Sequence, residues 1–169
     1  LFYQDAYGLR PYLRSMADRL AGAGYTVLVP NVFYRLGRTP VLELPEFIDP
    51  DADPTLWERL GPIVSGLTPD QVRRDADAYL RWLADSPVAS DGPVALTGYC
   101  MGARLVLWTA GAHPDRVAAG AGFHGGRLAT DDPDSPHLQA PNITAELYFG
   151  HADEDPSLPS EQVARFEEA

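Results

Sequence analysis

Apolar residues follow two patterns along this chain: short continuous runs, and a repeat at helical spacing. Continuous runs predict buried strands, at residues 1–3, 26–29, 94–97, 118–123 and 143–149. The helical repeat lies between these runs and predicts amphipathic helices. Strands that alternate with helices predict an α/β fold, with a mostly parallel sheet and helices on both of its faces.

Several predicted helices carry boundary signals. Pro11 suits the first turn of a helix, which Gly22 then ends. Thr68 is a good N-cap, and Gln71 three residues later completes the pattern of a capping box. Ser160 can cap a last helix. These signals support the alternation of strands and helices.

The segment 31–66 follows neither pattern and contains several prolines, so we expect it to be irregular. A loop of this length inside a compact domain is usually functional, which predicts a lid or a pocket wall. The first predicted strand is short, and the chain stops within its last predicted helix. We therefore expect residues 1–169 to be a single α/β domain truncated at both ends, a fragment that lacks both edges of its sheet.

Composition and charge narrow the classes of function. The chain has 169 residues, of which 45% are apolar and 22% charged, as expected for one globular domain. Its net charge of −11 repels nucleic acid and anionic membranes, so we expect neither as a partner. No apolar run approaches the roughly 18 residues of a transmembrane helix. The single cysteine excludes an internal disulfide and fits a reducing, cytoplasmic compartment.

The most informative motif is Gly98-Tyr99-Cys100-Met101-Gly102, between a predicted strand and a predicted helix. This is the context of a nucleophile elbow, a strained turn that needs small neighbours and lifts its central side chain above the sheet. The N-terminus of the following helix favours negative charge, so we expect a lowered pKa for the Cys100 thiol. The alternative is an inert buried cysteine. A metal site is a poor interpretation, because there is no second cysteine and the histidines are scattered.

A carboxylate follows the last predicted strand. In the fold of the nucleophile elbow, the nucleophile, the acid and the histidine follow one another in that order along the chain. Asp153 is the first carboxylate after the strand, so it is the predicted acid that orients the histidine and stabilises its charged form. Asp155 is the alternative, and an aspartate that merely shapes the turn is the non-catalytic interpretation.

The general base should be a histidine that follows the acid along the chain. None of the four histidines follows Asp153, so none of them is a candidate by this rule. His113 and His137 are expected at the surface, and His151 occupies a poor position for a base. His124 ends a predicted strand at the edge where pockets form in open α/β sheets, so it is either a pocket residue or a structural one. We expect the general base to lie beyond the end of this sequence.

The chain resembles the dienelactone hydrolase family over nearly its whole length. The resemblance rests on the elbow and on three further segments, at residues 5–10, 25–31 and 150–159. Members are α/β-hydrolases that open lactones or cleave esters with a cysteine, an aspartate and a histidine. The resemblance implies that Cys100 is the nucleophile and Asp153 the acid.

It also implies further site residues. The oxyanion hole would consist of the backbone N–H groups of Met101 and Ala6, in agreement with the general rule for this fold. Asp5 matches an acidic residue, usually glutamate, that helps to control the thiol, but it is one methylene shorter. Arg59 falls near an arginine that binds the substrate carboxylate in some members, in a segment that aligns poorly.

The expected function is therefore hydrolysis of carboxylic esters or lactones, with a small-molecule substrate and no metal or organic cofactor. Two alternatives stay open. One is a thiol-dependent acyltransferase or peptidase of the same fold, and the other is a degenerate hydrolase fold that serves as a binding module.

Overall fold

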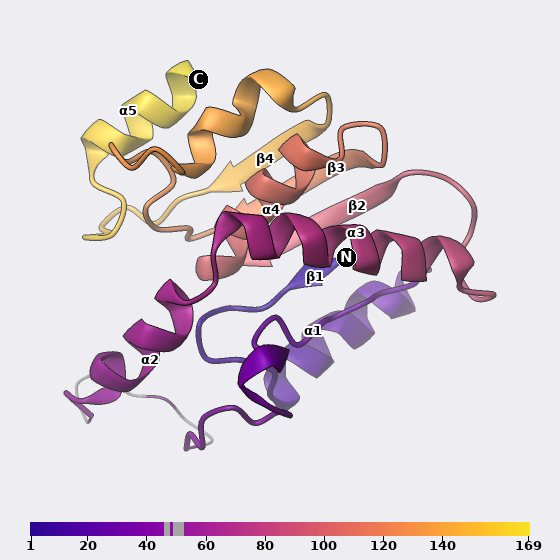
Figure 1. Ribbon diagram of the computed structural model, residues 1–169, viewed down its shortest axis with the longest axis horizontal. Helices are drawn as coiled ribbons and strands as arrows, with labels where there is room; N and C mark the ends of the chain where they lie inside the picture. The colour runs from indigo at the N-terminus through magenta and orange to yellow at the C-terminus, as the bar shows by residue number, and fades with distance from the viewer. Residues whose placement is uncertain (46–47, 49–52) are drawn as a thin grey trace.

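The computed structural model describes residues 1–45, 48 and 53–169. Its centre is a sheet of parallel strands in the spatial order β1-β2-β3-β4 (Figure 1). The strands are β1 (Phe2–Tyr3), β2 (Val94–Tyr99), β3 (Val117–Phe123) and β4 (Glu146–Gly150). The predicted parallel sheet is confirmed, and all the strands present their carboxyl ends at the same edge.

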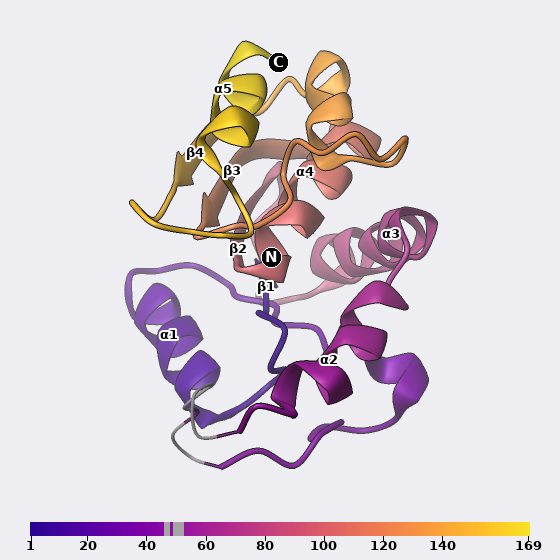
Figure 2. The ribbon, with the colours of Figure 1, turned by 90° about the vertical axis from the view of Figure 1, so that its left-hand side faces the viewer.

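Helices cover both sides of the sheet, as predicted. Figure 2 shows α3 and α4 on one side and α1 on the other. The helices are α1 (Pro11–Gly22), α2 (Leu56–Ser65), α3 (Pro69–Asp85), α4 (Met101–Ala112) and α5 (Ser160–Glu168), with 3-10 turns η1 (Tyr34–Leu36) and η2 (Pro136–Asn142). None of the helices within the described ranges is long and apolar enough to cross a membrane.

The core lies between the sheet and α4. Leu105, Val106 and Leu107 are at most 1% exposed, so α4 is enclosed almost all round. Two glycines of β3 allow this close packing: a Cβ at Gly120 would lie 2.9 Å from the Val106 side chain, and one at Gly122 would lie 3.1 Å from Ala103. The apolar helix that follows the elbow is thus held rigidly against the sheet.

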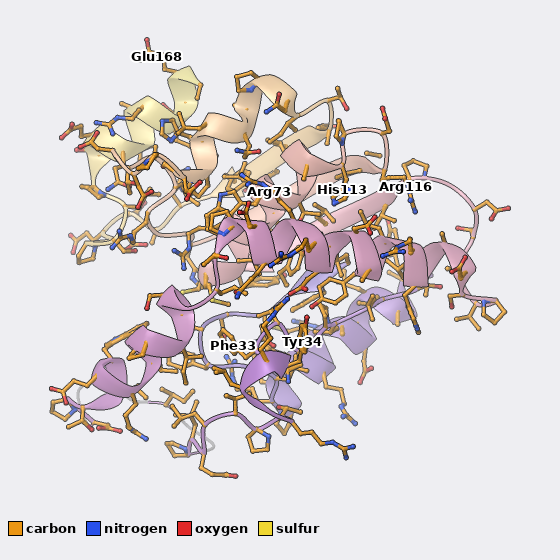
Figure 3. The ribbon with its side chains drawn as sticks, viewed as in Figure 1. Phe33, Tyr34, Arg73, His113, Arg116 and Glu168 are labelled. Atoms are coloured by element: carbon orange, nitrogen blue, oxygen red, sulfur yellow. The ribbon has the colours of Figure 1, made fainter. Side chains whose placement is uncertain are left out.

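An ion pair between Arg35 and the buried Asp75 attaches the segment after residue 30 to α3. Asp75, on α3, accepts two hydrogen bonds from Arg35, of 2.6 and 2.7 Å, and a third from the Tyr34 hydroxyl at 3.0 Å. Tyr34 points toward α3 in Figure 3. The capping box at Thr68 and Gln71 is also present, so the start of α3 follows the prediction.

Two predicted elements differ from the structure. Residues 26–29 do not form a regular strand: Phe2 N donates to Leu28 O at 2.9 Å, but no ladder continues from this bond. The irregular structure predicted for 31–66 is wrong at α2, because Leu56 and Leu60 bury their side chains at helical spacing although Pro62 lies inside the helix. The proposed lid falls partly on residues 46–47 and 49–52, which lie outside the described residues.

Candidate active site

Cys100 occupies the strained turn that the motif predicts. It lies directly between β2 and α4 with φ 53° and ψ −116°, a conformation that costs energy for a residue with a side chain. A Cβ at Gly98 would overlap the carbonyl of Gly102 and lie 2.9 Å from Ala103 N. A Cβ at Gly102 would lie 2.7 Å from the carbonyl oxygens of Tyr3 and Gln4. Both glycines are therefore required by the close approach of the backbone.

Two backbone N–H groups converge on the Cys100 sulfur. Those of Met101 and Ala6 lie close enough to lower the pKa of the thiol. Both residues are buried at 3% exposure, so these donors are shielded from water. A point near the sulfur that faces both donors is where an oxyanion would be stabilised.

The expectation of a lowered thiol pKa is wrong. Burial raises the pKa of the Cys100 thiol, and the negative charge of Asp5 raises it further. The backbone N–H groups of Met101 and Ala6 and the charge of Arg104 lower this pKa, but by less than burial and Asp5 raise it. The resting thiol is consequently protonated at neutral pH, and its reaction requires a base.

Asp5 lies beside the thiol but is held by another side chain. Its carboxylate accepts hydrogen bonds of 2.7 and 2.6 Å from Arg10 and one of 3.0 Å from the backbone N–H of Tyr7. Asp5 itself is 8% exposed. The shorter side chain thus pairs with Arg10 inside its own loop while its charge still influences Cys100.

Sequence reasoning missed two side chains near the sulfur, Tyr7 and Arg104. Tyr7 lies close enough that a thiolate would raise its pKa, after the larger effect of burial. Its ring tilts against Trp57 of α2, with centroids 6.2 Å apart. Arg104, in the first turn of α4, lies close enough to the thiol for the two charges to interact. The signal for Arg104 was its spacing of four residues from Cys100, which sets both on one side of a helix start.

Asp153 and Cys100 lie at the same edge of the sheet. The turn holding Cys100 follows β2 and the loop holding Asp153 follows β4, and the two strands are parallel. Asp155 is engaged locally, since its carboxylate accepts hydrogen bonds from Ser157 N at 2.8 Å and Ser157 Oγ at 2.6 Å. Asp153 is exposed, and no described residue hydrogen-bonds to its carboxylate.

The histidines differ in their surroundings. His113 contacts the carbonyl of Arg73 at 3.3 Å, and the two lie side by side in Figure 3. His137 is half-buried and bonds to Ser135 at 2.9 Å, so its predicted solvation is wrong. His151 packs edge-on against Phe166.

His124 lies at the carboxyl edge, where it was predicted. It is exposed, has φ 40°, and its ring lies 6.4 Å from that of Tyr99. In the described part of the chain, no histidine is hydrogen-bonded to Cys100 or Asp153.

Arg59 lies on α2 and is an exposed side chain paired with Asp53. Its guanidinium is thus occupied by a neighbour from the preceding turn. Across residues 1–45, 48 and 53–169, no group of three or more histidine, cysteine or acidic side chains is placed to hold a metal ion.

The parallel sheet, the covering helices and the strained turn before α4 define the class: this is an α/β-hydrolase domain. The family model described as the dienelactone hydrolase family matches residues 1–169. The chain belongs to that family.

Curated relatives have related names. The chain is 31% identical over 162 residues to a carboxymethylenebutenolidase homolog of Mus musculus, and covers 57% of it. It is 26% identical to the carboxymethylenebutenolidase of Rhodococcus opacus, with 97% of the chain and 59% of that protein aligned. A putative carboxymethylenebutenolidase of Methylorubrum extorquens is 26% identical over all of this chain and 55% of its own length. The chain thus spans a little over half the length of these relatives.

Solved structures share the fold. The structure called m3DLH superimposes with a TM-score of 0.74 at 27% identity, covering 99% of this chain and 62% of that one. A dienelactone hydrolase-like promiscuous phosphotriesterase, P91, from metagenomic libraries has a TM-score of 0.70 with the same coverage. At 24% identity, the second likeness shows the fold alone.

Proposed function

We propose that this chain forms the nucleophile-bearing part of a hydrolase that cleaves carboxylic esters or lactones through an acyl-enzyme on Cys100. The observation that carries the proposal is the strained backbone of Cys100 directly between β2 and α4, with the N–H groups of Met101 and Ala6 close enough to act on its sulfur. A buried cysteine without a chemical role needs neither the strain nor the two donors.

The first step is the formation of a thioester. A histidine base, which the resemblance implies and which we place outside this chain, takes the thiol proton. The sulfur attacks the carbonyl carbon, and the resulting oxyanion accepts hydrogen bonds from Met101 N and Ala6 N. Collapse of the intermediate breaks the C–O bond, and the leaving alkoxide takes the proton back from the histidine.

The second step is hydrolysis of the thioester. The same histidine removes a proton from water, which attacks the acyl carbon and releases the carboxylic acid with return of the proton to sulfur. Asp153 is the proposed acid that orients this histidine and stabilises its charged form. Its unoccupied carboxylate at the same edge as Cys100 supports this role, while Asp155 is held by Ser157.

The raised thiol pKa gives the proposed base its importance. Because the resting sulfur is protonated, it is a poor nucleophile until the base and the substrate are both in place. A small-molecule ester or lactone is the proposed partner, which the names of the relatives also support. A nucleophile that must stay reduced favours a cytoplasmic location.

The experiment is detection of the acyl-enzyme. When a chromogenic ester is mixed with the full-length protein and the reaction is quenched within the first turnover, the intact mass should rise by one acyl group, and peptide mapping should place that group on Cys100. Cys100→Ala should show neither change. Gly61→Ala, on α2 with open space around the added Cβ, is the matched control that should acylate normally. Acylation of the Cys100→Ala variant at the rate of the unmodified chain would disprove the proposal.

A further inference from the structure

The end of β3 is bonded to both of its neighbours through a single peptide group. The carbonyl of Phe123 accepts a hydrogen bond of 3.0 Å from Cys100 N. The N–H of His124 donates one of 2.8 Å to Gly150 O. This carbonyl and this N–H belong to the same planar peptide unit. The turn of the proposed nucleophile and the start of the acid loop, residues 151–159, are therefore attached to two sides of one rigid group.

The loop after β3 holds the acid loop a second time. Arg127 N donates a hydrogen bond of 2.7 Å to Ser157 O. Ser157 is itself fixed, because its backbone N–H and its hydroxyl donate to the carboxylate of Asp155 at 2.8 and 2.6 Å. Asp153 lies between the two attachments, after Gly150 and before Ser157. The hydrogen bonds from His124 and Arg127 thus form a clamp at both ends of the segment that carries Asp153.

Both donors of the clamp have an unfavourable backbone conformation. Within the described residues, the non-glycine residues with a positive φ are Cys100 at 53°, His124 at 40° and Arg127 at 56°. This conformation costs energy for a residue with a side chain, and it persists where the surrounding structure fixes it. The strain is therefore found at the proposed nucleophile and at the two residues whose N–H groups hold the acid loop.

Two glycines between the donors bring the loop into contact with both of its neighbours. A Cβ at Gly125 would lie 2.6 Å from that of Ala103, in the first turn of α4. A Cβ at Gly126 would lie 2.7 Å from that of Ser157. The loop after β3 thus lies between the helix that follows the nucleophile and the acid loop, with no room for a side chain at either contact.

We propose that His124 and Arg127 are positioning residues, whose strained backbones hold the acid loop so that Asp153 reaches the histidine base beside Cys100. This inference rests on the proposed function. A triad acid must lie within hydrogen-bond distance of the imidazole, and a displacement of about 1 Å can cost about 10²-fold in rate. The carboxylate of Asp153 is exposed, and no described residue hydrogen-bonds to it, so its position depends on the backbone that carries it.

The clamp can be displaced at Gly126 without changing Cys100 or Asp153. In the full-length protein, Gly126→Ala places a Cβ against Ser157 and should move the acid loop. The readout is the hydrolysis of a preformed thioester on Cys100, followed by intact mass at a series of pH values. Because the thioester carries no thiol proton, the acidic limb of this profile reports the histidine base alone. We expect hydrolysis to slow by about 10- to 100-fold, and the limb to move to lower pH by about one unit, since a displaced carboxylate stabilises the charged imidazole less.

Three further variants separate positioning from stability. Gly126→Ala/Ser157→Gly removes the side-chain atoms that the new Cβ meets, so its rate and its limb should return to those of Ser157→Gly alone. Gly111→Ala is the matched control: its Cβ would lie 2.7 Å from that of Gln139 in η2, so it should lower stability and leave the limb in place. Ser157→Ala loses only the hydroxyl bond to Asp155. It should move the limb in the same direction by less, and it serves if Gly126→Ala does not fold.

An unchanged limb in both Gly126→Ala and Ser157→Ala would overturn the inference, because the contacts would then only stabilise the edge of the sheet. A limb that moves equally in Gly111→Ala would overturn it as well, since the limb would then follow stability. Asp153→Asn tests the proposed function separately. If it leaves the limb in place, Asp153 is not the acid and the inference fails with that role. If it moves the limb while the clamp variants do not, the positioning role alone is refuted.

Discussion

Arg10 holds the carboxylate of Asp5 through two hydrogen bonds, of 2.7 and 2.6 Å, within a single short loop. The same loop contributes the N–H of Ala6 to the sulfur of Cys100. A charge that raises the thiol pKa and a donor that lowers it thus come from adjacent residues. Arg10 determines how much of the negative charge of Asp5 acts on the thiol.

The first prediction concerns Asp5→Asn. Removing the carboxylate removes a charge that disfavours the thiolate, so the pKa of Cys100 should fall. The iodoacetamide alkylation profile should move to lower pH, and the rate at pH 7 should rise several-fold. A profile that moves to higher pH would show that the carboxylate acts on the thiol as a base rather than as a repelling charge.

The second prediction concerns the partner of this carboxylate. Arg10→Gln leaves the charge of Asp5 uncompensated, so the pKa of Cys100 should rise and alkylation at pH 7 should slow. Arg14→Gln, an exposed arginine of α1, is the matched control and should leave the profile in place. Identical profiles for the Arg10 variant and this control would refute the shielding role of the ion pair.

The third prediction concerns the turn itself. Gly98→Ala should destabilise the fold by about 3 kcal/mol or more, because its Cβ would meet backbone atoms that cannot move aside. Gly61→Ala, in a helix with open space around it, should be neutral or gain about 0.5–1 kcal/mol. Urea unfolding followed by tryptophan fluorescence gives both values. Equal stability of the two variants would contradict the close approach at Gly98.

The fourth prediction concerns the ion pair on α3. Asp75→Asn leaves Arg35 without its carboxylate and should cost about 2 kcal/mol, less than for a fully buried pair since Arg35 is partly exposed. Arg81→Gln breaks the exposed Arg81–Asp77 pair and should cost no more than about 0.5 kcal/mol. Thermal and urea unfolding measure both. A cost for Asp75→Asn no larger than that for Arg81→Gln would show that the pair contributes little.

The fifth prediction separates the two aspartates after β4. In the full-length protein, Asp153→Asn should lower kcat for ester hydrolysis by up to about 10⁴-fold, as loss of a triad carboxylate does. Asp155→Ala removes the hydrogen bonds to Ser157 and should reduce stability more than turnover. The reverse order of effects on kcat would transfer the role of acid to Asp155.

Local signals predicted the parts of the fold that depend on neighbouring residues. The capping box at Thr68, the elbow at Cys100 and the alternation of strands and helices are each visible within a few residues, and the structure has them all. The failures are of another kind. Pro62 suggested a loop, but burial of Leu56 and Leu60 outweighs it, and that burial depends on the tertiary structure.

The strained turn at Cys100 was predictable from the sequence, but the electrostatics around it were not. The helix start at Met101 correctly indicated donors for negative charge near Cys100. The sequence could not show how deeply the thiol is buried, nor that Asp5 lies near it, and those two effects reverse the expected direction of the pKa.

The raised pKa of the thiol has a consequence for the lifetime of the protein under oxidative conditions. Hydrogen peroxide oxidises thiolates to sulfenic acid far faster than it oxidises thiols. A sulfur that stays protonated at rest is a slow target, although it becomes reactive as soon as a base removes its proton. The burial that raises the pKa of Cys100 therefore leads us to expect slow oxidation of this cysteine by peroxide as long as no base takes its proton.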